Sequence, residues 1–217
     1  MFEFDFAFLA TYSILLAVVV ALFRVRRIDR RFTPFIVLLA GGLLNEIISY
    51  YCIQRFGHNM VNYNVYCLFE SVVIFWLFAE WKVISRRTFA LLTVCAAVFW
   101  NTEYFIRGYA LEVNSWYVIA YSFSVAIMSI RVITDLLYKE SYRLYRNANF
   151  LIACAFLLFF ACSMVLEVFW VFRIMEDERF QVKLYGLFNY VNLFTNLVFA
   201  VAVLWIPSRP RSILALS

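Results

Sequence analysis

The sequence predicts an all-α integral membrane protein: a seven-transmembrane helix bundle that forms a single domain over residues 1–217. Composition gives the first indication, because 65% of the residues are hydrophobic and 15% are charged. A soluble domain would be about half apolar and about a quarter charged. The second indication is that the chain divides into seven apolar stretches. Each has close to the ~20 residues that a helix needs to cross ~30 Å of hydrocarbon.

The seven predicted spans cover residues 5–23, 34–53, 62–81, 88–106, 114–137, 149–172 and 186–206. None of them contains a proline in its interior. Pro34 follows Thr33 at the start of the second span, and proline is favoured at the first position of a helix. We therefore expect uninterrupted helices, unlike the broken helices of many ion-coupled transporters.

The distribution of basic residues predicts the orientation. Fourteen of the 19 Lys and Arg lie on one side of the predicted membrane, and five lie on the other. Since cytoplasmic loops carry an excess of Lys and Arg, the N-terminus is expected outside and the C-terminus in the cytoplasm. In a bacterial cell this membrane would be the cytoplasmic (inner) membrane. The net charge of +5 then reflects a basic face near anionic lipid, so it indicates no nucleic acid partner.

Three glutamates lie inside predicted spans. Glu46 and Glu70 are near mid-membrane, and Glu167 is in the outer half of the sixth span. An ionisable residue inside a membrane is costly, so by default it indicates a functional site. The sequence leaves the protonation state of Glu46 and Glu70 open.

Other polar residues accompany these glutamates. Tyr63, Tyr66 and Glu70 are spaced by three and four, so they share one face of the third span. Most polar groups fall between mid-membrane and the outer face, which predicts a polar cavity that opens outward. Packing by interhelical hydrogen bonds is the alternative interpretation. The predicted ligand-binding residues are Glu70, Glu46, Tyr66, Asn64, Tyr63, Asn45, Glu167, Asn189, Asn192 and Asn196.

Two segments indicate an internal repeat. N64-V-Y-C-L-F-E-S71 and N189-Y-V-N-L-F-T-N196 share Asn, Leu and Phe at the same offsets. The match predicts a 3+1+3 parallel repeat with the fourth span as linker, as in sugar transporters of the SWEET type. Microbial rhodopsins show a similar relation, so the repeat does not decide between transport and sensing.

Several chemistries lack the residues that they need. His58 is the one histidine, which argues against haem held by paired histidines and against a three-histidine zinc site. The last span contains no lysine for a retinal Schiff base. There is also no G-x-S-x-G, Walker or G-x-G-x-x-G segment. We therefore expect no catalytic residues, no metal and no cofactor.

The segment from L43-L-N-E46 through Y50-Y51 to N62-x-N-x-Y66-x-L-x-E70 carries a resemblance. It resembles small uncharacterised bacterial seven-helix membrane proteins, frequent in Bacteroidota, in which a Y-N-x-Y-x-L-x-E motif opens the third helix. The resemblance covers roughly 40 residues of the chain. It implies a seven-helix bundle with a polar site that uses Asn64, Tyr66 and Glu70, and it implies sensing without an assigned reaction.

The expected function is that of a non-enzymatic sensor or receptor-like protein that binds a small ligand or a proton. The loops and tails are short, so we expect the signal to pass to a separate protein partner on the cytoplasmic side. A small-solute or proton-coupled transporter is the second interpretation, and a structural subunit of a membrane complex is the third. An intramembrane enzyme would have to rest on acid–base chemistry of the buried carboxyls. The identities of the ligand and the partner, and the oligomeric state, stay open.

Overall fold

The computed structural model describes residues 2–107, 112–139, 144–172 and 178–208. In these ranges the regular elements are helices, apart from one isolated β-bridge between Ile28 and Ser208. Two one-turn helices, Arg30–Phe32 and Leu144–Arg146, precede longer ones. The main helices are α1 (Phe2–Tyr12), α2 (Ile14–Arg24), α3 (Thr33–Phe56), α4 (Met60–Glu80), α5 (Arg86–Arg107), α6 (Ser115–Lys139), α7 (Ala148–Val171) and α8 (Glu178–Trp205).

Six helices in the described part of the chain, α3 to α8, are long and apolar enough to cross a membrane. A shorter apolar helix, Phe8–Arg24, corresponds to the first predicted span. The prediction of an all-α, multi-pass integral membrane bundle is therefore confirmed. Helix α8 starts about two turns earlier than predicted, because the polar residues around Lys183 hide its beginning in the sequence. Its 28 residues span about 42 Å, more than the hydrocarbon thickness.

The first span has a one-residue irregularity at Ser13, between α1 and α2, which we call the break. The Ser13 backbone keeps helical angles there, φ −59° and ψ −24°, so the helix is distorted and not unwound. The Ser13 hydroxyl donates to the carbonyl oxygen of Ala10 at 2.6 Å. A serine that bonds back to its own helix in this way bends it. Two asparagine amides of α8 bond to the same place. Asn196 donates to the Ser13 hydroxyl at 2.8 Å, and Asn192 donates to the Ala10 carbonyl at 3.4 Å.

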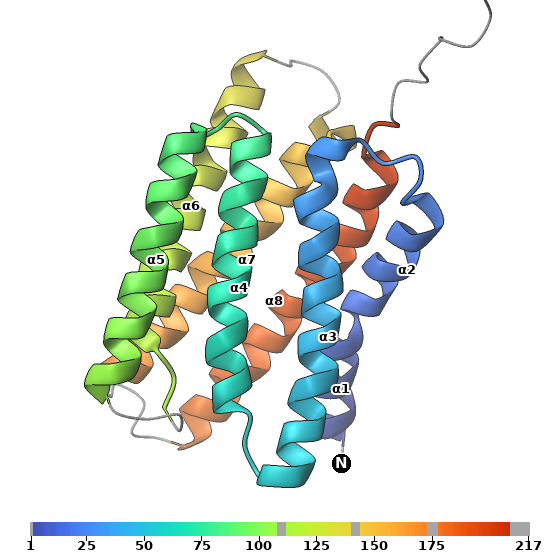
Figure 1. Ribbon diagram of the computed structural model, residues 1–217. Helices are drawn as coiled ribbons and strands as arrows, with labels where there is room; N and C mark the ends of the chain where they lie inside the picture. The colour runs from blue at the N-terminus through green and yellow to red at the C-terminus, as the bar shows by residue number, and fades with distance from the viewer. Residues whose placement is uncertain (1, 108–111, 140–143, 173–177, 209–217) are drawn as a thin grey trace, which may run out of the picture.

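The helices form a closed ring in sequence order, running alternately up and down (Figure 1). Helices α1 and α2 pack against both α3 and α8, and each following helix packs against the next. Helix α4 also contacts α6, which leaves α5 on the outside of the ring. The inside of the ring is therefore formed mainly by α3, α4, α7 and α8.

The two ends of the bundle differ. The turns after α2 and α4 meet at one end, the upper end in Figure 1, and we call it the basic end because it carries a cluster of arginines and Lys82. There the Arg24 guanidinium donates to the carbonyl oxygens of Val203, Leu204 and Ile206. These bonds satisfy the C-terminal carbonyls of α8, and a cation is favourable at that helix end. The chain begins at the other end, which we call the N-terminal end.

Two helices end in left-handed residues of different kinds. Gly57 follows α3 with φ 78°, and its N–H donates to the carbonyl oxygen of Ile53. Lys82 follows α4 with φ 61°, and the N–H of Val83 donates to the Phe78 carbonyl at 2.9 Å. The second arrangement is a Schellman motif with lysine where glycine is preferred. A side chain in this backbone region costs roughly 1 kcal/mol, so Lys82 occupies a position that favours glycine.

Gly41 and Gly42 let α3 approach its neighbours closely. A Cβ atom at Gly41 would lie 2.3 Å from the Phe69 ring, and one at Gly42 would lie 2.6 Å from the Cδ1 atom of Ile14. Neither distance is compatible with van der Waals contact. A side chain at either position would therefore require the Phe69 ring or the Ile14 side chain to move.

Gly42→Ala is expected to lower the free energy of unfolding by about 1 kcal/mol, because the added methyl overpacks the contact with Ile14. Gly186→Ala is the matched control, since a Cβ atom there meets no heavy atom within 4 Å. It should raise stability by about 0.5–1 kcal/mol through helix propensity alone. Unfolding in mixed detergent–SDS micelles measures both. Shifts of the same sign would contradict the close approach at Gly42.

Candidate functional site

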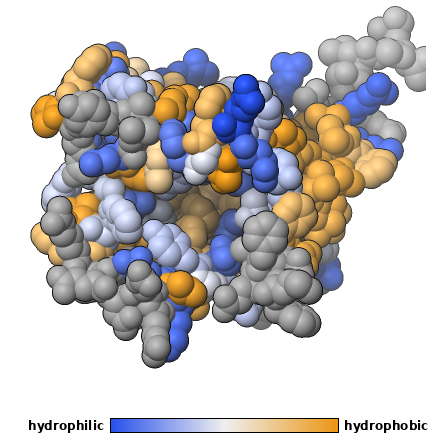
Figure 2. Space-filling model, turned by 90° about the horizontal axis from the view of Figure 1, so that it is seen from below, coloured by the Kyte–Doolittle hydropathy of each residue, from blue (hydrophilic) through white to orange (hydrophobic). Residues whose placement is uncertain are grey.

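A cavity of about 220 Å³ lies inside the ring of helices, and every helix except α5 lines it. Seen from the N-terminal end, the molecule is hollowed in the middle, with hydrophilic residues around the rim and hydrophobic ones at the bottom (Figure 2). The polar lining residues are Thr11, Asn45, Glu46, Ser49, Asn59, Tyr63, Tyr66, Glu70, Tyr121, Ser163, Asn192, Thr195 and Asn196. Seven of the ten predicted site residues are in this set.

Aromatic rings of α7 and α8 form part of the apolar wall of the cavity, and further rings pack behind them. Phe156 packs edge-to-face against Phe160 and Phe199, with ring centroids 5.9 Å and 5.5 Å apart. Phe35 and Phe78, both fully buried, extend this cluster to α3 and α4. We call these five residues the aromatic layer. Edge-to-face packing of this kind is favourable and leaves little free space.

Glu70 lies beside tyrosines from two helices. The Tyr121 hydroxyl of α6 donates to the Oε2 atom of Glu70 at 2.7 Å. The Tyr66 hydroxyl, one turn earlier on α4, lies close to the same carboxyl. The bond from Tyr121 ties the Glu70 carboxyl of α4 to α6. Tyr121 was not among the predicted binding residues, although its spacing of four from Tyr117 places the two tyrosines on one face of α6.

Glu46 lies on α3 and interacts electrostatically with Glu70. Both carboxyls line the cavity, and none of the described residues that line it is Lys, Arg or His. Charge buried without a partner is strongly unfavourable. The pair is therefore suited to take up a proton, to bind a cation, or to accept hydrogen bonds from a neutral ligand.

Asparagines join α3 to α4 beside Glu46. The Asn62 amide donates to the Asn45 side-chain oxygen at 2.8 Å and to the Ser49 hydroxyl at 2.9 Å. Asn45 and Ser49 line the cavity, whereas Asn62 stands behind them. These bonds fix the wall beside Glu46, as expected for polar groups that join packed membrane helices.

On the opposite side, α8 contributes Asn192, Thr195 and Asn196 to the cavity. The two asparagines bond to the break at Ser13, so they are partly used in packing. Thr195 is 2% exposed, and its hydroxyl has no hydrogen-bond partner among the residues that the structure describes. A buried polar group of this kind requires a partner such as a water molecule or a ligand.

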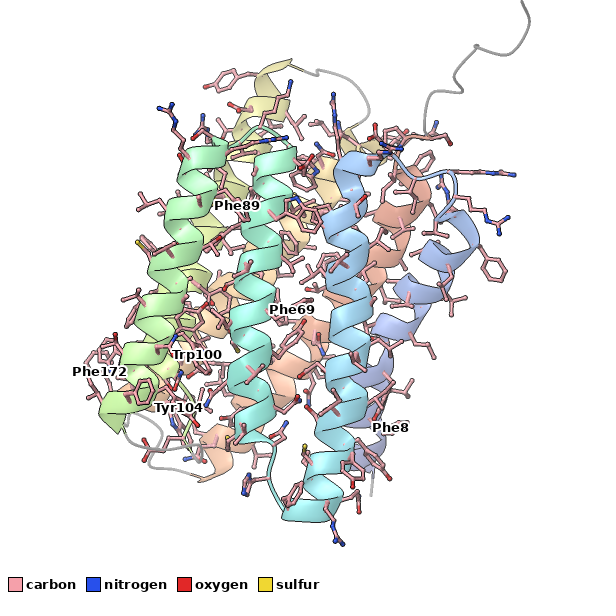
Figure 3. The ribbon with its side chains drawn as sticks, viewed as in Figure 1. Phe8, Phe69, Phe89, Trp100, Tyr104 and Phe172 are labelled. Atoms are coloured by element: carbon pink, nitrogen blue, oxygen red, sulfur yellow. The ribbon has the colours of Figure 1, made fainter. Side chains whose placement is uncertain are left out.

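Asn64 lies outside the cavity, contrary to the prediction. It is fully buried, and its amide donates to the Glu112 carbonyl at 2.7 Å while its side-chain oxygen accepts from the Asn114 N–H at 3.0 Å. The Trp100 indole donates to the Asn64 carbonyl at 2.8 Å, from the end of α5 where Figure 3 labels it. Asn64 therefore anchors the segment before α6.

Glu167 and Asn189 also lie outside the cavity lining. Glu167 lies close to the Ser115 side chain at the start of α6. On α8, Phe188 lines the cavity where Asn189 was expected to do so. Asn189, Asn192 and Asn196 lie on one face of α8, but their spacing does not show how far along the helix the cavity extends.

Glu103 is a buried carboxylate that the sequence interpretation did not place in the site. Its two oxygens accept from the N–H groups of Trp116 at 3.1 Å and Tyr117 at 2.7 Å. Glu103 on α5 thus caps the first turn of α6 in the way that an N-cap side chain does. We attribute to it a structural function.

Within the described ranges, no group of three or more His, Cys, Asp or Glu side chains is placed to hold a metal ion. The chain matches no family model, no curated protein sequence and no solved structure. The resemblance carried by residues 43–70 therefore stays a prediction, and the cavity is the basis for a functional interpretation.

Proposed function

We propose that this protein is a non-enzymatic, receptor-like membrane sensor that binds a small ligand or a proton in the central cavity. The observation that carries the proposal is the cavity with Glu46 and Glu70 in its wall and the aromatic layer beside them. A sensor needs access from one side only, and the hollow at the N-terminal end supplies it. With the orientation predicted from charge, this end faces outward and the basic end faces the cytoplasm.

The composition of the wall favours particular ligands. Two carboxyls without a basic neighbour favour a proton, a cation or a hydrogen-bond donor over an anion. The volume is somewhat below the ~300–1,000 Å³ of pockets for drug-sized ligands, so the ligand would be small. The exposed loops at the basic end would pass the signal to a separate protein partner.

A screen for ligands tests the proposal. The purified protein is incubated with a collection of small amines, alcohols and amides, and ligands are identified by a rise in unfolding temperature. Glu70→Gln and Glu46→Gln are each expected to weaken binding by about tenfold, equivalent to ~1.4 kcal/mol. Glu80→Gln is the matched control, because this glutamate is also on α4 but hydrogen-bonds to Trp76 outside the cavity. Ligand affinity that is unchanged in both Glu70→Gln and Glu46→Gln would contradict the proposal.

A proton-coupled or small-solute transporter is the second candidate, and the break at Ser13 favours it. Cavity-lining asparagines of α8 bond to this irregular turn, and transporters often bind their substrates at irregular points of membrane helices. Reconstitution into proteoliposomes separates the two proposals. A sensor carries no flux of the identified ligand or of protons, whereas a transporter carries flux that Glu70→Gln reduces.

A further inference from the structure

A second hollow, separate from the central cavity, lies at the basic end. It is an open groove of about 970 Å³ between the turn that follows α4, the start of α5 and the last part of α6. Four basic side chains line it: Arg31, Lys82, Arg86 and Arg131. They come from three parts of the chain, since Lys82 and Arg86 are only four residues apart, and the fold brings Arg31 and Arg131 to them.

These four cations are exposed, and none is paired with a carboxylate among the described residues. Glu80 is the one acidic residue in the lining, and its carboxyl accepts from the Trp76 indole at 3.2 Å. Four like charges that converge on one groove repel each other unless an anion binds between them. The groove is therefore suited to a multiply coordinated anion.

The N-terminus of α5 adds to this potential. Ser85 precedes the helix, and its hydroxyl accepts from the Thr88 N–H at 3.0 Å as an N-cap. Ser85, Arg86 and Thr88 all line the groove. The first turn of a helix carries a partial positive charge, and together with arginine it is a common binding site for phosphate.

The conformation of Lys82 is an independent observation. Its φ of 61° is one that glycine adopts without strain, yet a lysine stands there and extends into the groove lining. Strained residues are concentrated at functional sites, where the side chain has a use that compensates for the strain. Here the use would be the ammonium group in the groove.

The groove also has an apolar part. Trp76 and Phe89 line it from the last turns of α4 and the first turn of α5, and Figure 3 labels Phe89 beside these helix ends. An aromatic pair next to a cationic cluster matches the boundary between acyl chains and headgroups. We propose that the groove binds a phosphate group, and its position at the membrane boundary favours the phosphodiester of an anionic lipid over free phosphate.

Native mass spectrometry of the full chain tests this inference. The retention of phosphatidylglycerol is compared with that of phosphatidylcholine for the wild type and for two fourfold variants. One carries Arg31→Gln, Lys82→Gln, Arg86→Gln and Arg131→Gln in the groove. The other carries Arg26→Gln, Arg27→Gln, Arg30→Gln and Arg87→Gln, which removes the same charge from the same end outside the groove.

We expect the groove variant to lose about tenfold in preference for phosphatidylglycerol and the control variant to lose less than about threefold. Equal losses in both variants would mean that the whole face attracts anions, and this would overturn the inference. A wild type that neither prefers phosphatidylglycerol nor binds pyrophosphate through the groove cations would also overturn it. Pyrophosphate distinguishes the sources. If it binds with the same dependence on the groove cations while neither lipid is preferred, the ligand is a soluble phosphate and the phosphate site stands.

Lys82→Gly separates the loss of a cation from a loss of stability. Glycine suits the left-handed position, so the variant should unfold at the same or a higher temperature than the wild type. It should nevertheless bind phosphatidylglycerol more weakly, because one of the four cations is gone. Unchanged lipid binding in this stable variant would contradict a role for Lys82.

Discussion

Glu103→Ala is expected to lower the free energy of unfolding by about 3 kcal/mol. The carboxylate makes two charge-assisted bonds to the N–H groups of Trp116 and Tyr117, and each such bond contributes roughly 1.5–3 kcal/mol. Alanine would leave both buried donors at the start of α6 without this acceptor. Unfolding of the purified protein in mixed detergent–SDS micelles measures the loss.

Two variants make this result specific. Glu103→Gln retains one acceptor oxygen but loses the charge, so its stability should lie between those of the wild type and Glu103→Ala. Thr102→Ala, on the exposed side of the same turn, removes a hydroxyl bonded only to the Val98 carbonyl of its own helix. It should change stability by less than about 0.5 kcal/mol. If Glu103→Ala is no less stable than Thr102→Ala, the capping interpretation is wrong.

Glu70→Ala is the second substitution with a large expected effect, a loss of about 1–2 kcal/mol. It removes the acceptor of the Tyr121 hydroxyl, and interhelical hydrogen bonds in membranes are worth ~0.6 to ~1.7 kcal/mol each. A double-mutant cycle with Tyr121→Phe isolates the bond between α4 and α6. The interaction energy should be about 0.6–1.7 kcal/mol.

Ser71 and Tyr117 provide the comparison for this cycle. Their hydroxyls lie 2.5 Å apart, also between α4 and α6, but neither residue lines the cavity. A cycle with Ser71→Ala and Tyr117→Phe should give a similar interaction energy and leave ligand binding unchanged. Additive losses for Glu70→Ala and Tyr121→Phe would show that the two side chains do not interact.

The membrane fold was accessible from the sequence because it depends on composition and length. Apolar stretches near 20 residues predict spans whatever their partners are. The break at Ser13 was not accessible, since the sequence carries neither proline nor glycine there. It depends on a serine hydroxyl that bonds back to Ala10 and on amides from α8, which is distant in sequence.

The candidate site was accessible only in part, for reasons of helix geometry. Helical spacing places Tyr63, Tyr66 and Glu70 on one face, and all three line the cavity. Asn64 lies one position further along and therefore about 100° around the helix. It belongs to a second polar face with Ser71, which packs against α6. The sequence contains both polar faces but does not state which one borders the cavity.

The orientation and the 3+1+3 repeat stay predictions, and so does a location in the bacterial inner membrane. The structure places α5, the predicted linker span, on the outside of the ring. In such a repeat, a rotation would superpose the three spans before the linker on the three spans after it. A few matching residues in two segments do not define that rotation. The positions of the basic residues at one end provide the physical basis for the orientation.

Modification of a cysteine placed in the cavity tests the central claim most directly. Thr11→Cys is nearly isosteric at a partly exposed residue of the cavity wall, and it is introduced into a variant whose five native cysteines are replaced. Ser129→Cys is the control, because this serine is fully buried and lies outside the cavity lining. A membrane-impermeant thiol reagent is applied to oriented vesicles from each side. We predict that Thr11→Cys reacts only from the side of the N-terminus and that Ser129→Cys does not react. Reaction of Thr11→Cys from the basic end, or from neither side, would contradict a cavity that opens at the N-terminal end.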